Sequence, residues 1–236
     1  MDLMPDAIPL PLVYPPSSWL AQLHLLTGGS VRRLDPGEFL LHEGQRSSCL
    51  WLLQSGAVTL ASTTPSGKRA TLAVLGPGAV LGEHGLVGPL IDPRQRGPTM
   101  LPEASALMAS TVQAIPLSGL HAAMASDPYV AWWLAAAVSW RAIQVERALA
   151  RVLALRVPQR VLGALQDLAL ELGHASPGGL RIRLPLTQDL LASMAGATRE
   201  SVNRAIAELE QQGLVRRMGL RYELLLPPAE SADGPG

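Results

Sequence analysis

The sequence predicts an α+β protein built from an all-β N-terminal part, one long central helix, and a small C-terminal part of helices and a hairpin. Three observations predict this. Short apolar runs separated by glycines fill residues 31–87, a long helical pattern follows Asp127, and two short amphipathic helices meet at Gly196. These patterns divide the chain into a flexible segment 1–18, a β domain 19–126, a central helix 127–156, a C-terminal domain 157–226 and a disordered tail 227–236.

The composition is that of a chain with ample core-forming residues and no general positive charge. Of 236 residues, 48% are hydrophobic, and the formal net charge is zero, so attraction to nucleic acid has to come from a local patch. The single cysteine, Cys49, excludes an internal disulfide and a cysteine-ligated iron–sulfur cluster within one chain. The N-terminus lacks a signal-peptide pattern, and charges interrupt the most apolar long stretch, 129–155. We therefore expect a cytoplasmic protein without membrane contact.

Residues 31–87 have the pattern of a β sandwich or barrel. Apolar runs at 38–42, 49–54, 57–61 and 69–75 alternate with glycine turns, as is typical of short antiparallel strands. The stretch 88–102 contains four prolines and two glycines and predicts a surface loop. Strand character resumes at 106–115, and short helices are expected at 18–26 and 117–126.

Asp127 and Pro128 mark a helix start, with Asp as the N-cap and Pro at the first helical position. In the helix that follows, valines recur every seven residues and a second heptad position interleaves with them. This pattern is typical of a two-stranded parallel coiled coil and predicts a homodimer interface, formed by Leu134, Val138, Arg141, Val145 and Val152. We expect a second face, with Ile143, Leu149 and Leu153, to pack on the β domain. The alternative is a helix buried within one domain.

The C-terminal domain follows the order helix, strand, two helices and hairpin, which is that of a winged helix. A helix at 159–172 opens after Pro158, a strand covers 180–184, and a hairpin over 214–226 turns near Gly219. In the two central helices, Thr187 and Thr198 are placed as N-caps, and Gly196 permits the tight turn between them.

The second of these helices separates apolar from polar positions. Val202, Ile206 and Leu209 fall at helical spacing and predict its buried face. The opposite face is left with side chains that can read base edges, because Arg pairs with guanine O6 and N7 and Glu accepts from cytosine N4. The alternative is a solvated charged face with Arg–Glu pairs such as Glu200–Arg204. We predict contacts to double-stranded DNA by Thr187, Gln188, Thr198, Arg199, Glu200, Ser201, Asn203, Arg204, Arg216 and Arg217.

The heptapeptide Thr198-Arg-Glu-Ser-Val-Asn-Arg204 resembles the helix-turn-helix of the cyclic-AMP receptor protein/fumarate-nitrate regulator (CRP/FNR) family of bacterial transcription factors. The region from Gly37 to Glu83, with its paired glycines, is similar to that family's double-stranded β-helix, a cyclic-nucleotide-binding-like jelly roll. The resemblance covers about residues 20–226. It implies a homodimeric regulator with RNA polymerase as a partner. It also implies TGTGA-like half-sites ~34 Å apart, where Arg199 and Arg204 meet guanines and Glu200 meets a cytosine.

The same resemblance implies an effector site at Gly82 and Glu83, because cyclic-nucleotide-binding members use this Glu for the ribose. About ten residues later they carry Arg-Ser/Thr-Ala for the phosphate. Here Arg94 lies near that distance, but Gln95-Arg96-Gly97 follows it. Since a buried phosphate without a fixed guanidinium lacks its charge partner, we expect either no effector or one other than cyclic AMP. The alternative is a cyclic-nucleotide-dependent activator that uses Glu83 and Arg94.

Two further classes of function would need only the β domain. A metal-dependent cupin-like enzyme requires converging His and carboxylate ligands, usually with a His-x-His pair, and the five histidines form no such pair. A regulatory module that acts through protein contacts would not need the set Arg199, Glu200 and Arg204. We therefore expect a DNA-binding regulator and no enzyme activity.

Overall fold

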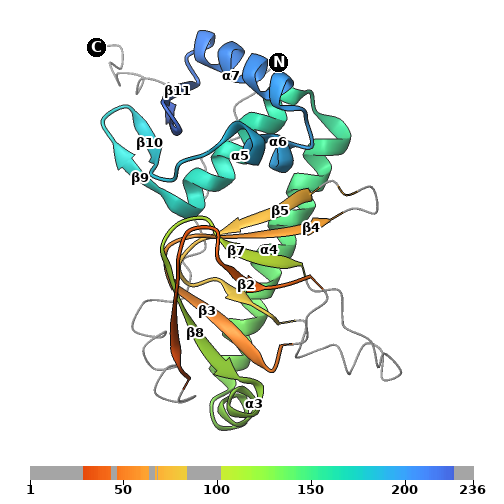
Figure 1. Cartoon of the computed structure of the whole chain (residues 1–236), viewed down its shortest axis with the longest axis vertical. Coiled ribbons are helices and arrows are strands. Elements are labelled where there is room, and N and C mark those ends of the chain that lie inside the picture. Colours follow the sequence, from red (N-terminus) through yellow and green to blue (C-terminus); the bar gives the residue numbers. More distant parts are fainter. Residues whose placement is uncertain (1–28, 44–46, 64–66, 68, 84–101, 226–236) are drawn as a thin grey trace, which may run out of the picture.

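The computed structural model describes residues 29–43, 47–63, 67, 69–83 and 102–225. It places a β domain and a C-terminal helical domain along one long helix (Figure 1). Several expectations lie outside the described residues: the flexible segment 1–18, the helix at 18–26, the tail 227–236, and all of the loop 88–102 except Pro102.

Eight strands in the described part form the β domain, as two four-stranded sheets with the orders β1-β8-β3-β6 and β2-β7-β4-β5. Leu34, Leu53 and Val112 of the first sheet pack with Leu60 and Leu75 of the second in one core. Of the sandwich and the barrel that the sequence predicts as alternatives, the structure has the antiparallel sandwich. The strands are β1 (Val31–Leu34), β2 (Phe39–Leu41), β3 (Cys49–Ser55), β4 (Val58–Thr63), β5 (Arg69–Leu75), β6 (Val80–Leu81), β7 (Glu103–Ala106) and β8 (Ser110–Pro116).

Gly56 carries the chain from β3 in one sheet to β4 in the other. Its φ of 91° lies in the left-handed region, which glycine adopts without a steric penalty. A Cβ at this position would lie 2.2 Å from Ser110 Oγ and 2.6 Å from Ala109 O. The turn between the sheets therefore requires glycine both for its backbone angle and for its space.

Two helices follow the β domain, α3 (Leu117–Ser126) and α4 (Pro128–Ala154). The side chain of Asp127 accepts a hydrogen bond from Tyr129 N at 3.0 Å. The predicted start of the long helix is therefore confirmed, with Asp as its N-cap and Pro128 in its first turn.

The inner face of α4 differs from the predicted one. Val130, Trp133 and Leu134 pack on Leu50, Ile115 and Leu120 of the β domain and α3, and Arg141 pairs with Glu83. Leu134 and Arg141, which we expected in a dimer interface, are thus engaged within their own protomer. The prediction that Ile143, Leu149 and Leu153 pack on the β domain is wrong, because all three are exposed. Heptad spacing fits more than one face of a long helix, so periodicity alone could not choose between them.

The C-terminal domain is a winged helix whose sheet has the order β11-β12-β10-β9. The predicted helices and hairpin are present. Residues 173–176 add a strand that we did not predict, because they pair with β10 across the turn at Pro177-Gly178. The elements are α5 (Val157–Leu172), β9 (Gly173–Ser176), β10 (Gly179–Ile182), α6 (Gln188–Ala195), α7 (Arg199–Gln211), β11 (Val215–Met218) and β12 (Arg221–Leu225).

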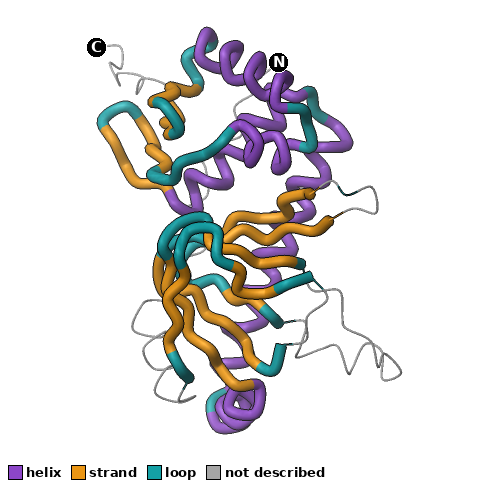
Figure 2. The backbone as a smooth tube through the Cα atoms, viewed as in Figure 1, coloured by secondary structure: helices purple, strands orange, loops and turns teal. Residues whose placement is uncertain are grey.

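The C-terminal domain docks on β5, the edge strand of the second β-domain sheet (Figure 2). Thr71 N donates a hydrogen bond to Ser193 Oγ of α6 at 2.7 Å, and the N–H that follows β5 donates to the Glu171 carboxylate of α5 at 3.0 Å. Ala57 and Val74 of the β domain belong to the same hydrophobic core as α5, α6 and α7. The docked domain therefore covers an edge that would otherwise offer unpaired backbone groups.

Candidate nucleic-acid interface

The turn between α6 and α7 is built by local capping. Thr187 Oγ1 accepts from Leu190 N at 3.1 Å and begins α6. Gly196 ends α6 with a φ of 57°, and Thr198 Oγ1 accepts from Ser201 N at 3.2 Å to begin α7. Each of these roles follows from the residue type, since a threonine oxygen satisfies an orphan N–H and glycine tolerates the left-handed region.

The two faces of α7 are those that the spacing predicts. Val202, Ile206 and Leu209 are buried, together with Ala205. Arg199, Glu200, Asn203 and Arg204 are exposed, and Ser201 is half-buried. Among the described residues, no hydrogen bond or ion pair joins Glu200 to Arg204, so the predicted alternative of an internal pair at these positions is not what the structure has.

Arg199 and Asn203 are linked through Gln188, the first residue of α6. Arg199 Nε donates to Gln188 Oε1 at 3.3 Å, and Gln188 Nε2 donates to Asn203 Oδ1. Arg199 Nη1 also lies 3.7 Å from Asp189 Oδ2. The sequence predicts Gln188 as a DNA contact, but its position as a bridge between Arg199 and Asn203, two other predicted contacts, becomes visible only in the fold.

The wing, β11 and β12, carries its arginines beside carboxylates. Arg216 Nη1 donates to Glu223 Oε2 at 3.0 Å, and Arg217 N donates to Glu210 Oε1 at 3.0 Å. Glu223 is fully buried, and hydrogen bonds from Ser176 and then Arg181 hold the pKa of its carboxyl below the usual range. Arg216 is therefore partly neutralised by Glu223, its partner across the predicted hairpin.

Glu83 lies at the inner end of a pocket between the β domain and α4. Its carboxylate is buried and pairs with Arg141, whose Nη1 also donates to Val80 O at 3.0 Å. Gly82 has a φ of 82°, and a Cβ there would lie 3.0 Å from Cys49 O. The predicted phosphate partner, Arg94, lies outside the described residues.

A cavity of about 300 Å³ adjoins this ion pair. Its polar lining consists of Arg141, Ser62 and Glu43, and Ser62 Oγ donates to the Glu43 carboxylate at 2.7 Å. That hydrogen bond, with a second from Thr63 N, holds the pKa of Glu43 below its usual range. Its apolar lining is Leu60, Leu72, Ala73, Pro102 and Val145. The size suits a small molecule, and the described lining carries one carboxylate, Glu43, and one guanidinium, Arg141.

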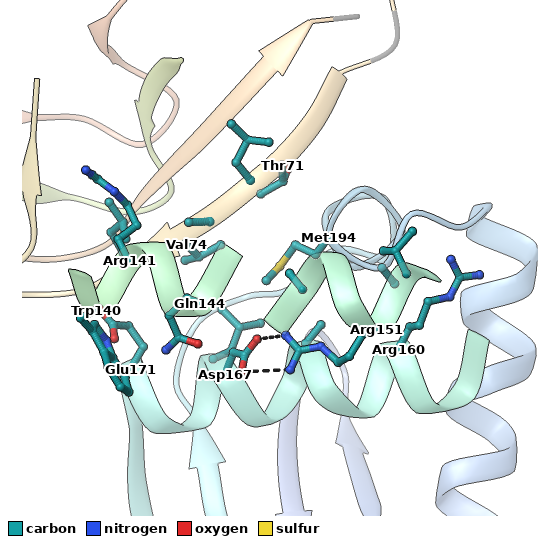
Figure 3. A pocket seen from close by; sticks show the side chains of 18 residues that line it. Thr71, Val74, Trp140, Arg141, Gln144, Arg151, Arg160, Asp167, Glu171 and Met194 are labelled. Atoms are coloured by element: carbon teal, nitrogen blue, oxygen red, sulfur yellow. Dashed lines mark hydrogen bonds and ion pairs between the residues drawn. The ribbon is translucent and has the colours of Figure 1, made fainter. Parts of the chain in front are cut away.

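A second, smaller cavity of about 70 Å³ lies where α4, α5, α6 and β5 meet (Figure 3). Arg151 of α4 and Asp167 of α5 face each other in it through two hydrogen bonds. Burial raises the pKa of Asp167 above its usual range, although Arg151 acts in the opposite direction. This ion pair connects the long helix to the DNA-reading domain.

Within the described ranges, no cluster of three or more His, Cys, Asp or Glu side chains could hold a metal ion. The same part of the chain contains no helix long and apolar enough to cross a membrane.

Two family models match the chain. Residues 31–127 match the cyclic nucleotide-binding domain, and residues 159–229 match the Crp-like helix-turn-helix domain. The first match covers the sandwich with its pocket, and the second covers the domain that carries α6 and α7.

Characterised proteins are similar to this chain across both domains. A cyclic AMP receptor protein of Thermus thermophilus is 31% identical over 188 residues, 78% of this chain and 79% of the relative. A CRP-like cAMP-activated global transcriptional regulator of Mycobacterium tuberculosis is 29% identical over 194 residues, 80% of this chain and 83% of the relative.

A solved structure has the same fold. The c-di-GMP-responsive global regulator CLP of Xanthomonas campestris superposes with a TM-score of 0.71 and 21% identity, covering 89% of this chain and all of that one. With a helix-turn-helix, both domain matches and a 31% identical relative, the chain belongs to the CRP/FNR family of transcription regulators.

Proposed function

We propose that the chain acts as a homodimeric, sequence-specific transcription regulator that reads TGTGA-like half-sites with α7. The observation that carries the proposal is the exposed face of α7. Arg199, Glu200 and Arg204 lie on this face, outside the domain core, and an N-cap fixes the start of the helix. Two guanidinium groups and a carboxylate match two guanines and a cytosine in a major groove. The wing arginines and the threonine hydroxyls supply phosphate contacts, and RNA polymerase is the proposed partner.

A second copy of the chain is needed to present two reading helices to a palindrome. The outer face of α4 supports this, because Trp132, Ile143, Leu149 and Leu153 are exposed there. Val145 and Val152 of the predicted interface are also exposed at its border. We therefore propose a dimer seam that is rotated around α4 from the predicted set, away from Leu134 and Arg141.

The experiment is a mobility shift on a palindrome with two TGTGA half-sites. Arg199→Ala should weaken binding at least about tenfold, since one bidentate contact contributes about 1–3 kcal/mol in each half-site. Arg33→Ala, which removes an equally exposed arginine from β1, is the matched control and should bind as the wild type does. Equal binding by the Arg199→Ala variant and the wild type would exclude readout by α7.

For the effector, we propose a ligand other than cyclic AMP, or none. The relatives named above are described as responding to different nucleotides, cAMP in one and c-di-GMP in another. Here Arg141, the guanidinium that lines the cavity, is paired with Glu83 of the same protomer, and Glu43 places a carboxylate in the cavity. Among the described lining residues, a cyclic phosphate entering the cavity would meet a guanidinium that is already paired and a carboxylate that repels it.

The alternative is a cyclic-nucleotide-dependent activator that uses Gly82, Glu83 and Arg94, and the cavity of about 300 Å³ beside Glu83 favours it. Thermal melting with and without cyclic AMP and cyclic GMP separates the two proposals. If a nucleotide raises the Tm and Arg94→Ala abolishes that rise, the alternative holds. A Tm that neither nucleotide changes supports the first proposal.

A further inference from the structure

The exposed edge of α6 and α7 carries a chain of hydrogen bonds in which each donor and each acceptor has a fixed place. Arg199 offers only donors, so the Gln188 carbonyl has to face it, and the Gln188 amino group then faces Asn203. Asn203 Oδ1 accepts this bond and is turned towards α6. The amino group of Asn203 is the part of the amide left to face a ligand.

This direction matters because asparagine reads DNA through both ends of its amide. A free asparagine accepts from adenine N6 and donates to adenine N7. When Gln188 turns the Asn203 carbonyl towards α6, Asn203 presents its amino group, a donor, to the base. Guanine offers two adjacent acceptors, O6 and N7, thymine offers O4, and adenine offers one acceptor beside a donor.

From this geometry we infer that Gln188 is a specificity-determining positioning residue that makes Asn203 a donor. At the base pair that Asn203 faces, the protein prefers guanine or thymine over adenine. The inference rests on the proposed function, because it specifies how the same helix reads its site. The exposed bonds themselves contribute little to folding, so their effect is on base preference.

The test variant is Gln188→Glu. A glutamate still accepts from Arg199 but has no N–H for Asn203, so the Asn203 amide turns over and frees its carbonyl. Helix α6 tolerates the change, since an acid in the first turn of a helix is favourable. The added charge weakens binding to all sequences, so the readout is the ratio of affinities among sites. The preference at one base pair should move towards adenine by about tenfold.

The measurement is competition binding to the palindrome and to each of its single-base substitutions, with thermal melting to verify folding. Asn203→Ala identifies the base pair that Asn203 faces, because this variant loses discrimination among bases at that position. Gln188→Ala should flatten the preference at that pair, because neither end of the Asn203 amide is then fixed.

The inference is overturned if the wild type is specific and both Gln188 variants show the same ratios of affinities among the bases at that pair as the wild type does. It is equally overturned if Asn203→Ala changes no position. If the wild type itself does not distinguish the palindrome from random DNA, the proposed function fails first.

Discussion

The two long faces of α4 have opposite characters. The inner face, against the same protomer, carries Arg141 and Arg151, which are only 15% and 18% exposed and pair with Glu83 and Asp167. The outer face carries Leu149 and Leu153, which are 56% and 78% exposed. The inner face therefore holds part-buried charges among its apolar contacts, while large apolar side chains face solvent on the outer face.

This difference indicates two separate tasks for one helix. Exposed apolar side chains gathered on one face mark an interaction surface, and a second copy of α4 is the partner that the proposed function requires. The inner ion pairs, by contrast, join α4 to the β domain at Arg141 and to the DNA-reading domain at Arg151. Under the proposed function the outer face serves assembly, and the inner face joins the two domains.

The largest expected effect comes from placing a charge on the outer face. Leu153→Glu would bury an unpaired carboxylate from each copy in the seam, which costs several kcal/mol. The dimer dissociation constant should rise by about a hundredfold or more, measured by analytical ultracentrifugation.

The matched control for that variant is Val31→Glu, which makes the same kind of change at an exposed position of β1 and should leave the dimer intact. A Leu153→Glu protein that sediments as the wild-type dimer does would show that the outer face is not the seam.

The contrast between the faces also shows where sequence reasoning succeeds and where it stops. The caps at Asp127, Thr187 and Thr198 and the turn at Gly196 were predicted, because each depends on residues within one helical turn. The buried face of α7 was predicted for the same reason. Such signals are local, and the structure confirms them.

Features that depend on contacts between residues far apart along the chain were not predicted. The inner and outer faces of α4 have similar apolar spacing, and only the β domain decides which one is covered. The strand at 173–176 forms only because β10 lies beside it. The pairing of Arg141 with Glu83 joins segments whose proximity no local pattern contains.

The second expected effect concerns the inner face at the β domain. Arg141→Met leaves the buried Glu83 carboxylate without its guanidinium, and such a loss destabilises a protein by about 3 kcal/mol. Chemical denaturation measures this change in the free energy of unfolding. Adding Glu83→Gln to Arg141→Met should recover part of the loss, because the remaining buried group is then neutral. A double variant as unstable as the sum of the single ones would mean that the two side chains are not coupled.

The smallest expected effect concerns the other inner pair and its dependence on pH. Burial raises the pKa of Asp167 above its ordinary value of 3.8. Its contribution to stability is therefore fully present below that value and is lost as the pH rises through the raised pKa. In Asp167→Asn this dependence disappears. The difference between the free energies of unfolding of the wild type and the variant should thus fall as the pH rises from 3.5 to 7. Chemical denaturation across that range measures it. A difference that instead grows with pH would show that attraction to Arg151 outweighs burial, and that this end of the inner face is held by charge.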